Sequence, residues 1–169
     1  MNKYVSIEEF ATDFPLVSFY TARLEGSKLS ETEKFVERFL EHAEFKRDFD
    51  TIMAWLEKMG SDLGARRIFF RDEEGANALP PRKGILEKYT PAFVEFSQLR
   101  LYCVRVSDQI VILLNGGTKT SEKVQDSPDC MVHFRFAIQF CKQLDRLIQE
   151  GEIKIRTKTL ELNELGFYL

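Results

Sequence analysis

Two segments in the middle of the chain show the clearest strand pattern. In LRLYC, residues 99–103, leucine and cysteine alternate with arginine and tyrosine, which is the twofold period of a β-strand. Residues 110–114, IVILL, are apolar at every position, as in a strand whose two faces are both covered. We therefore predict two neighbouring strands, of which the second is the centre of a sheet, with Ile112 and Leu114 fully buried.

Segments with a helical period lie on both sides of these strands. Ser30 and Glu33 have the spacing of a capping box, and apolar residues then recur on one helical face. The same period continues through residues 49–63, so we predict an N-terminal helical hairpin. A further helix is predicted over residues 127–151, since a Ser-Pro pair opens this segment and a glycine closes it.

The other segments have weaker patterns. Residues 16–25 mix aromatic and branched side chains and are predicted to form the first strand. Residues 66–88 are expected to be an irregular connector, with DEEG as a turn and LPPRKG as a stiff stretch. The tail from residue 152 has strand composition, but Leu160 and Leu162 are out of frame with the preceding isoleucines, which predicts a bulge or a break. We expect this tail to pair with the sheet or with a second subunit.

The composition is that of one compact α+β domain. The chain has 169 residues, of which 44% are hydrophobic and 30% are charged, and it contains 15 Phe. Such a sequence can bury enough apolar surface to fold as a single unit over residues 1–169. We expect a core over about residues 16–150 and an additional strand-like tail over residues 151–169.

The amino-terminal segment and the cysteines indicate a cellular compartment. Glu8 and Glu9 interrupt the amino-terminal segment where a signal peptide needs an apolar stretch, and the longest aliphatic run has five residues. The three cysteines are odd in number and lie among apolar residues, which is typical of reduced thiols. We therefore expect a cytoplasmic, bacterial-type protein without a membrane partner.

Charge is distributed unevenly along the chain. Residues 66–123 contain ten Lys and Arg against seven Asp and Glu, a balance of +3, which leaves −6 for the rest of a chain with net charge −3. The whole protein lacks the basic field of a nonspecific nucleic-acid binder, because its pI is about 5.6. Its middle can still form a local cationic cleft.

Several short motifs do not support the chemistry that they first suggest. GGTKT is not a phosphate-binding P-loop, because Thr118 stands where that motif needs glycine. Cys130 and His133 have a spacing that could share a metal, but no second ligand pair exists, so we interpret them as packing residues and expect no metal. His42 is interpreted as a solvated or capping group. The aromatic run HFRFAIQF has helical spacing and is expected to pack in the core.

One longer segment resembles a known family. LRLYCVRVSDQIVILLNGGTKTSEKVQDSPD is similar to the corresponding part of the RelE/ParE superfamily of toxin-like proteins, and most similar to its HigB-like, phage-derived branch. Arg100 and Tyr102 match a strand motif of arginine, hydrophobic residue and tyrosine. Lys119 and Lys123 stand in for a pair of cations, and the Ser-Pro pair matches the start of the following helix. The similarity covers roughly residues 16–150.

The resemblance implies a fold and a function. The fold would be RelE-like, with a small, mostly antiparallel sheet packed on an N-terminal helical hairpin, a further C-terminal helix and a positively charged concave face. The function would be that of a toxin-type endoribonuclease in a type II toxin-antitoxin pair, which cleaves mRNA, often on the ribosome. Its partners would be a cognate antitoxin, the ribosome and mRNA. The chemistry requires neither a metal nor another cofactor.

The expected site is built from cations. Arg100 suits a bidentate contact with phosphate, Lys119 a point-charge contact, and Tyr102 can stack on a base or orient the phosphate. We expect Gly116 and Gly117 to turn the chain so that Lys119 and Arg100 face each other as solvent-facing cations. The hypothesis requires Arg82, Arg100 and Lys119 to converge. Further RNA contacts are expected from Arg82, Lys83, Arg105 and Lys123.

Two other functions stay open. A catalytically silent module on the same fold would bind a protein partner through the sheet edge or the tail. This alternative is favoured by the acidic pI and by Thr118, which occupies a position that is commonly cationic in the family. On this interpretation Arg100, Lys119 and Lys123 form only the solvated edge of a sheet. A DNA-binding regulator is the least favoured function, because no helix carries a run of exposed base-reading side chains.

Overall fold

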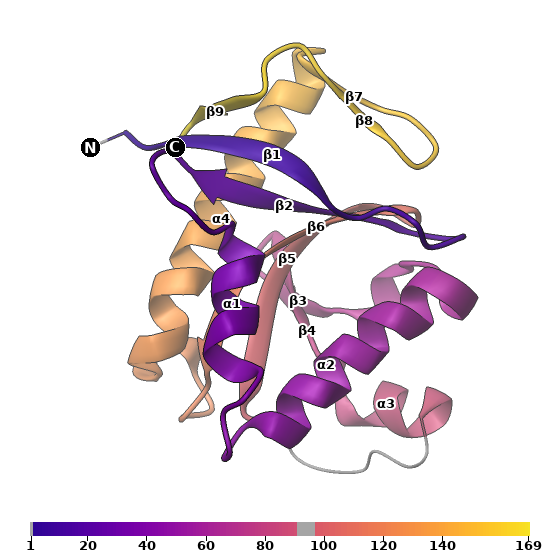
Figure 1. Cartoon of the computed structure of the whole chain (residues 1–169), viewed down its shortest axis with the longest axis vertical. Coiled ribbons are helices and arrows are strands. Elements are labelled where there is room, and N and C mark those ends of the chain that lie inside the picture. The colour runs from indigo at the N-terminus through magenta and orange to yellow at the C-terminus, as the bar shows by residue number, and fades with distance from the viewer. Residues whose placement is uncertain (1, 91–96) are drawn as a thin grey trace.

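The computed structural model describes residues 2–90 and 97–169 (Figure 1). In these two ranges the chain forms four α-helices and nine strands. The strands are β1 (Tyr4–Ala11), β2 (Ser18–Leu24), β3 (Arg71–Glu73), β4 (Ala76–Leu79), β5 (Leu99–Ser107), β6 (Ile110–Thr118), β7 (Ile153–Ile155), β8 (Leu160–Leu162) and β9 (Gly166–Tyr168). The helices are α1 (Glu31–Phe39), α2 (Lys46–Lys58), α3 (Lys83–Tyr89) and α4 (Pro128–Gln149), and three short helical turns are η1 (Met59–Leu63), η2 (Arg67–Phe69) and η3 (Val124–Asp126).

Seven of the strands form one mixed sheet in the order β3-β4-β5-β6-β2-β1-β9. β2 and β6 run parallel, and the other neighbours in this sheet are antiparallel. β7 and β8 form a separate antiparallel hairpin. The α+β class and the mostly antiparallel sheet are therefore confirmed.

Helices cover both faces of the sheet (Figure 1). α4 packs on one face together with Ile110, Ile112 and Leu114 of β6. α1, α2 and α3 pack on the other face, where Val111 and Leu113 contribute. Ile112 and Leu114 are 0% exposed, so the predicted central strand is confirmed. β6 is apolar on both sides because it lies between two hydrophobic layers.

The chain begins with the sheet, so the expected N-terminal helical hairpin is wrong. β1 and β2 form an antiparallel pair before the first helix, with Val5 opposite Leu24 and Ile7 opposite Ala22. Val5 and Ile7 alternate with polar residues and are buried under α4. Glu8 is half-buried and Glu9 is exposed, beside an irregularity in the β1–β2 register, so the strand accommodates both acidic residues.

The two predicted helices are present and follow β2. The Oγ of Ser30 accepts a hydrogen bond of 3.2 Å from the backbone N–H of Glu33, which is half of the predicted capping box. The rings of Phe35 in α1 and Phe49 in α2 lie 6.0 Å apart, on the same face of the sheet. The second helix continues through η1 and stops at Gly64, whose φ of 76° is a conformation that glycine adopts easily.

The segment 66–88 is not the irregular connector that we expected. It contains the β3–β4 hairpin and α3, and Glu74 and Gly75 form the hairpin turn with φ values of 51° and 104°. The expected turn in DEEG is thus confirmed, but its flanks pair as strands. Three and four residues are too few for a readable twofold period, which explains why the pattern did not predict them.

The tail completes the sheet. β9 pairs with β1, with Phe167 opposite Val5. Residues 152–162, for which we predicted pairing with the sheet or with a second subunit, instead form the separate β7–β8 hairpin. Pairing of that segment with the main sheet is therefore wrong, and pairing with a second subunit stays a prediction. Leu160 and Leu162 are out of frame with Ile153 because a turn between β7 and β8 reverses the chain. In the described residues, no helix has the length and apolar character needed to cross a bilayer.

Candidate functional site

A cationic pocket lies where β5 begins and β6 ends. It has a volume of about 450 Å³ and is bounded by β3, the start of β5 and the loop after β6. Its lining residues are Arg71, Gln98, Arg100, Lys119, Thr120, Ser121 and Glu122. Three of these seven residues are cations. Arg100 and Lys119 both line the pocket, whereas Arg82, the third cation that the hypothesis required to converge with them, does not, and Arg71 lies there instead.

Register explains why Arg71 and Arg100 meet. Arg71 pairs with Ala78 across the β3–β4 hairpin, and Ala78 pairs with Tyr102 of β5. Arg100 is two residues before Tyr102 and therefore points to the same face of the sheet. This is the face that α4 covers, because Tyr102 and Ala78 pack with that helix.

Arg100 is buried, although the sequence suggested a solvent-facing cation. Its side chain is 4% exposed. Its Nη1 donates hydrogen bonds to the carbonyl oxygens of Ser97 and Leu99, at 2.8 and 2.9 Å. Its Nε is buried and has no hydrogen-bond partner among the described residues. Burial lowers the pKa of the guanidinium. A buried N–H without a hydrogen-bond acceptor costs folding free energy, and a bound ligand that accepts this hydrogen bond would remove the cost.

Arg71 adds a second guanidinium to the pocket. Its Nε donates to the carbonyl oxygen of Pro80 at 2.8 Å. Burial, together with the nearby charges of Arg100 and Arg82, lowers the pKa of Arg71 to about 10. Within the described ranges, neither Arg71 nor Arg100 has a carboxylate oxygen within 4.0 Å. Three cations and one carboxylate, that of Glu122, line the pocket. The lining therefore keeps a surplus of positive charge, and an anion would relieve the repulsion between the cations.

Hydrogen bonds hold the loop that carries Lys119. The backbone N–H of Lys119 donates to the carbonyl oxygen of Gln98 at 2.6 Å. The N–H groups of Thr120 and Ser121 both donate to the Oγ of Ser127, at 3.1 Å. Ser127 precedes α4 as predicted, but its side chain fixes this loop and does not cap the helix. The loop is thus tied to the start of α4 and to the start of β5.

Asp129 connects this loop to α1. Its Oδ2 accepts hydrogen bonds from the N–H of Thr118 at 2.7 Å and from Arg38 at 2.8 Å. Burial raises the pKa of Asp129, but the hydrogen bonds from Arg38 and Thr118 outweigh it, so the pKa lies below the ordinary 3.8. Asp129 is therefore ionised at neutral pH and positions the residue that precedes Lys119.

Gly116 and Gly117 do not turn the chain, contrary to our expectation. Both lie in β6, opposite Leu101 and Arg100, and neither has a positive φ. A β-carbon on Gly116 would overlap the carbonyl of Arg100, and one on Gly117 would lie 2.5 Å from Oδ2 of Asp129. The glycines are required for close approach of neighbouring backbone and side chain.

Glu73 is a carboxylate beside these cations that the sequence analysis did not find. It lies on β3, is half-buried, and feels the charges of Lys119, Arg100 and Arg71. Burial raises the pKa of Glu73 above its ordinary value, although these cations oppose the increase. Arg71 and Glu73 were missed because their segment was interpreted as irregular. The turn DEEG, with short flanks of alternating polarity, was the available signal.

The other predicted RNA-binding cations lie outside the pocket lining. Arg82 precedes α3 and is exposed, but it is close enough to act on the pKa of Arg71. Lys83 forms an exposed ion pair with Glu87 at 3.6 Å. Lys123 is exposed at the start of η3. Arg82 therefore extends the cationic surface toward α3, whereas Lys83 is engaged within its own helix.

Arg105 lies toward the opposite end of β5 from Arg100. Its Nε donates to the carbonyl oxygen of Ala65 at 2.6 Å, and its Nη2 pairs with Asp108. Its side chain is 15% exposed. These contacts tie the β5–β6 turn to the segment after η1, which is a structural role distant from the pocket.

Tyr102 lies beneath the pocket in the hydrophobic core. It is 1% exposed, its ring packs edge-on against Phe134 at 6.0 Å, and the thiol of Cys130 lies near enough to its hydroxyl to act on the pKa of the phenol. Burial raises the pKa of the phenol well above its ordinary value. Stacking on a base would require an exposed ring, so this geometry gives Tyr102 a supporting position under Arg100.

The histidines and cysteines contribute no metal site in the described part of the chain, where no group of three or more His, Cys, Asp or Glu side chains is placed to hold a metal ion. Cys130 is buried beside Tyr102, and His133 is half-buried one turn further along α4, with a pKa lowered by burial. His42 is exposed and its ring packs between Phe39 and Phe45.

The arrangement can bind an anion of the size of a phosphate group. Two guanidinium groups and one ammonium group line a recessed pocket, and a half-buried carboxylate lies beside them. Comparison with protein-family models, with characterised proteins and with solved structures finds no match to this chain.

Proposed function

We propose that the protein is a toxin-type endoribonuclease with a RelE-like fold, which cleaves mRNA on translating ribosomes and is held inactive by a cognate antitoxin. The observation that carries the proposal is the convergence of Arg71, Arg100 and Lys119 in one pocket, with a buried guanidinium N–H that has no partner in the described residues. The strand motif and the Ser-Pro helix start in residues 99–128 resemble those of the RelE/ParE superfamily and support the family that we propose.

The cations suit phosphodiester cleavage. In the proposed reaction the ribose 2′-oxygen bonds to the adjacent phosphorus, and the bond from phosphorus to the 5′-oxygen of the next nucleotide breaks. The products are a 2′,3′-cyclic phosphate and a 5′-hydroxyl. Negative charge increases on the phosphate in the transition state, and guanidinium and ammonium groups stabilise it there. Arg100 and Arg71 bind the phosphate oxygens, and Lys119 stabilises the leaving oxygen and donates its proton.

Glu73 is the proposed general base. It is the half-buried carboxylate that interacts with all three cations of the pocket, and its pKa is raised by burial. A carboxylate whose pKa is raised toward neutrality accepts a proton more readily than an ordinary one. Glu73 takes the proton of the 2′-hydroxyl as the new bond to phosphorus forms. Two observations support this role, the raised pKa of Glu73 and its electrostatic interaction with the three cations of the pocket.

The test is cleavage of mRNA by purified ribosome complexes, together with growth arrest on expression. We expect the wild-type chain to cleave, and Lys119→Gln, Arg71→Gln and Glu73→Gln each to reduce the rate by about 100-fold or more. Lys142→Gln is the matched control, because Lys142 is exposed on α4 and does not line the pocket. The variant Arg100→Lys keeps the positive charge but removes the planar guanidinium group, so it tests whether the reaction requires that group.

If the wild-type chain neither cleaves mRNA nor arrests growth, the enzyme proposal fails. The catalytically silent interaction module then becomes the better function. A specific observation favours that module as the second candidate, because β9 lies at the end of the sheet and has no neighbouring strand on its outer side in the described residues.

A further inference from the structure

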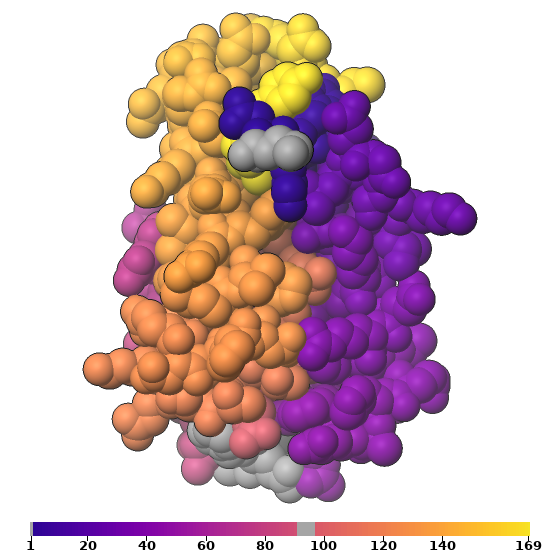
Figure 2. Space-filling model, turned by 90° about the vertical axis from the view of Figure 1, so that its left-hand side faces the viewer, coloured from indigo at the N-terminus to yellow at the C-terminus, as the bar shows by residue number. Residues whose placement is uncertain are grey.

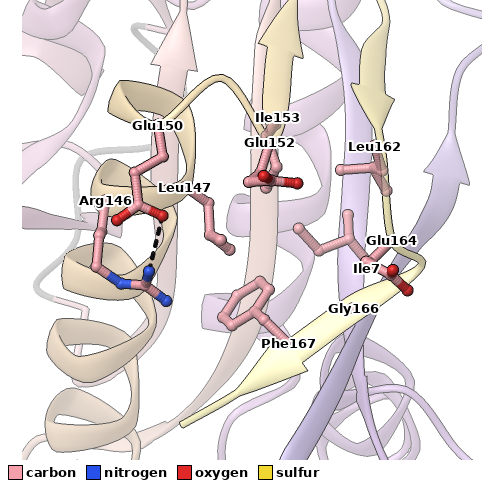
Figure 3. Close-up of a pocket in the computed structure, with 10 residues that line it drawn as sticks. All are labelled: Ile7, Arg146, Leu147, Glu150, Glu152, Ile153, Leu162, Glu164, Gly166 and Phe167. Atoms are coloured by element: carbon pink, nitrogen blue, oxygen red, sulfur yellow. Dashed lines mark hydrogen bonds and ion pairs between the residues drawn. The ribbon is translucent and has the colours of Figure 1, made fainter.

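A second pocket lies at the other end of α4 from the cationic pocket. It is formed by the last turns of α4, the β7–β8 hairpin, β1 and β9, and has a volume of about 300 Å³ (Figure 3). Asp129 and Glu150 are separated by 21 helical residues, which corresponds to about 32 Å along the axis. The two pockets therefore cannot hold the same small ligand. Figure 2 shows α4 and its orange surface running along one side of the molecule toward the yellow tail.

The floor of this pocket is apolar and its rim is acidic. The apolar lining residues are Ile7, Leu147, Ile153, Leu162 and Phe167, and the charged ones are Arg146, Glu150, Glu152 and Glu164. Figure 3 shows Leu147 and Phe167 on one side of the opening, with Glu152 and Glu164 near its edge. Such a lining fits an aliphatic stem that ends in a polar head.

The rim carries surplus negative charge. Arg146 pairs with Glu150 at 2.9 Å, which neutralises one carboxylate. Glu152 accepts a hydrogen bond of 3.1 Å from the side-chain amide of Asn163, which leaves its charge in place. Glu164 is exposed and has no ion pair in the described parts of the chain. Two uncompensated carboxylates attract a cation and repel phosphate, so nucleic acid and anionic lipid do not suit this site.

The backbone beside the pocket is open for strand pairing. Lys3 and Leu169 exchange backbone hydrogen bonds, and the N–H of Ile7 donates to the carbonyl of Leu165. Hydrogen bonding alternates along an antiparallel pair, so the backbone N–H and C=O groups of the odd-numbered residues of β9 point toward β1. The backbone groups of Gly166 and Tyr168 therefore point to the outer edge of the sheet. Gly166 also lines the pocket.

From these observations we propose that this end of the molecule binds an extended segment of a partner protein, which pairs with the outer edge of β9 and places an arginine or lysine side chain in the pocket. The stem of that side chain packs on Leu147 and Phe167, and its cationic group lies near Glu152 and Glu164. The volume is at the lower end of the range for ligand pockets and suits one side chain better than a larger molecule. The inference does not depend on ribonuclease activity, since the two pockets share no lining residue.

The test uses amide chemical shifts of the full chain during titration with a synthetic peptide. The probe is an eight-residue peptide of alternating threonine and valine with one central arginine and blocked ends, added to 1 mM. We expect shifts at Gly166, Tyr168 and the C-terminal turn of α4, and binding at least tenfold weaker when the central arginine is replaced by glutamate. The Lys119→Gln background serves if the wild-type chain is toxic to the expressing cells.

Two protein variants separate the site from general charge. Glu164→Lys should weaken binding of the arginine peptide at least tenfold, while Glu37→Lys, an exposed position on α1, should leave it unchanged. Absence of shifts at 1 mM, equal binding of both peptides, or equal binding to Glu164→Lys would overturn the proposal. The last part of the test is a titration with agmatine, a small guanidinium compound. Binding of agmatine as tight as that of the peptide would overturn strand pairing and indicate a site for free amines.

Discussion

A β-carbon on Gly116 would overlap the carbonyl oxygen of Arg100. This relationship arises because β5 and β6 pair with an irregular register, in which Leu101 lies opposite Gly116 but Cys103 lies opposite Leu113. Two residues of β6 thus face one of β5, as in a β-bulge, and the strands approach closely beside it. The backbone that carries Arg100 therefore depends on a glycine three residues before Lys119.

Gly116→Ala should destabilise the fold strongly. The added methyl group meets backbone atoms, which cannot rotate away as a flexible side chain can, so we expect a loss of about 3 kcal/mol or more in the free energy of unfolding. Urea denaturation followed by circular dichroism measures it. Gly84→Ala is the control, because a β-carbon there meets no atom within 4 Å and lies in a helix, where alanine is favoured. Equal midpoints for the two variants would contradict the close approach.

Leu114→Ala should cost about 2–5 kcal/mol of unfolding free energy, because the side chain is 0% exposed and its removal leaves a cavity. The matched control is Val132→Ala, since Val132 is 67% exposed on α4. Chemical denaturation of both variants makes the comparison. A midpoint for Leu114→Ala equal to that of the wild type would refute the central position of β6.

Asp129→Asn should destabilise the protein by about 1–3 kcal/mol at neutral pH, because the Arg38 and Thr118 contacts then lose a charged acceptor. The pKa of Asp129 is lower in the folded protein than in the unfolded chain. Its stabilising contribution is therefore present above about pH 4 and disappears as the pH falls through the folded pKa. Denaturation curves at pH 7 and pH 3 should show a larger difference between the variants at pH 7 than at pH 3. A difference of equal size at both pH values would contradict this ionic role.

Inorganic phosphate should stabilise the protein through the cationic pocket. At ten times its dissociation constant a ligand adds about 1.4 kcal/mol, which raises the melting temperature by roughly 3–6 °C for a chain of this size. Differential scanning calorimetry in phosphate and in sodium chloride of equal ionic strength tests it. Arg71→Gln should remove the increase, whereas Lys142→Gln should retain it. An increase that persists in Arg71→Gln would place the bound anion elsewhere.

The local sequence pattern was sufficient to predict much of the fold. The two strands around residues 99–114, the capped helix at Ser30 and the helix after Ser127 were predicted because each has a period or a cap within a few neighbouring residues. Arg100 and Lys119 were likewise found from one continuous motif. The N-terminal strand and the β3–β4 hairpin were missed, since β1 was considered only for export and the hairpin strands are too short to show a period.

Pairing between distant segments decided the rest. Arg71 reaches Arg100 only because β3 pairs with β4 and β4 pairs with β5, and these hydrogen bonds depend on strand order and register. The same holds for β9, which finds its partner in β1 at the far end of the chain. The sequence by itself determined the segments with a clear period or cap, which are β2, β5, β6, α1, α2 and α4, and it indicated Arg100 and Lys119 as cations of a site. The tertiary structure decided that Arg100 is buried and that Arg71 and Glu73 lie close to it, because burial and convergence are set by packing between residues far apart in the chain.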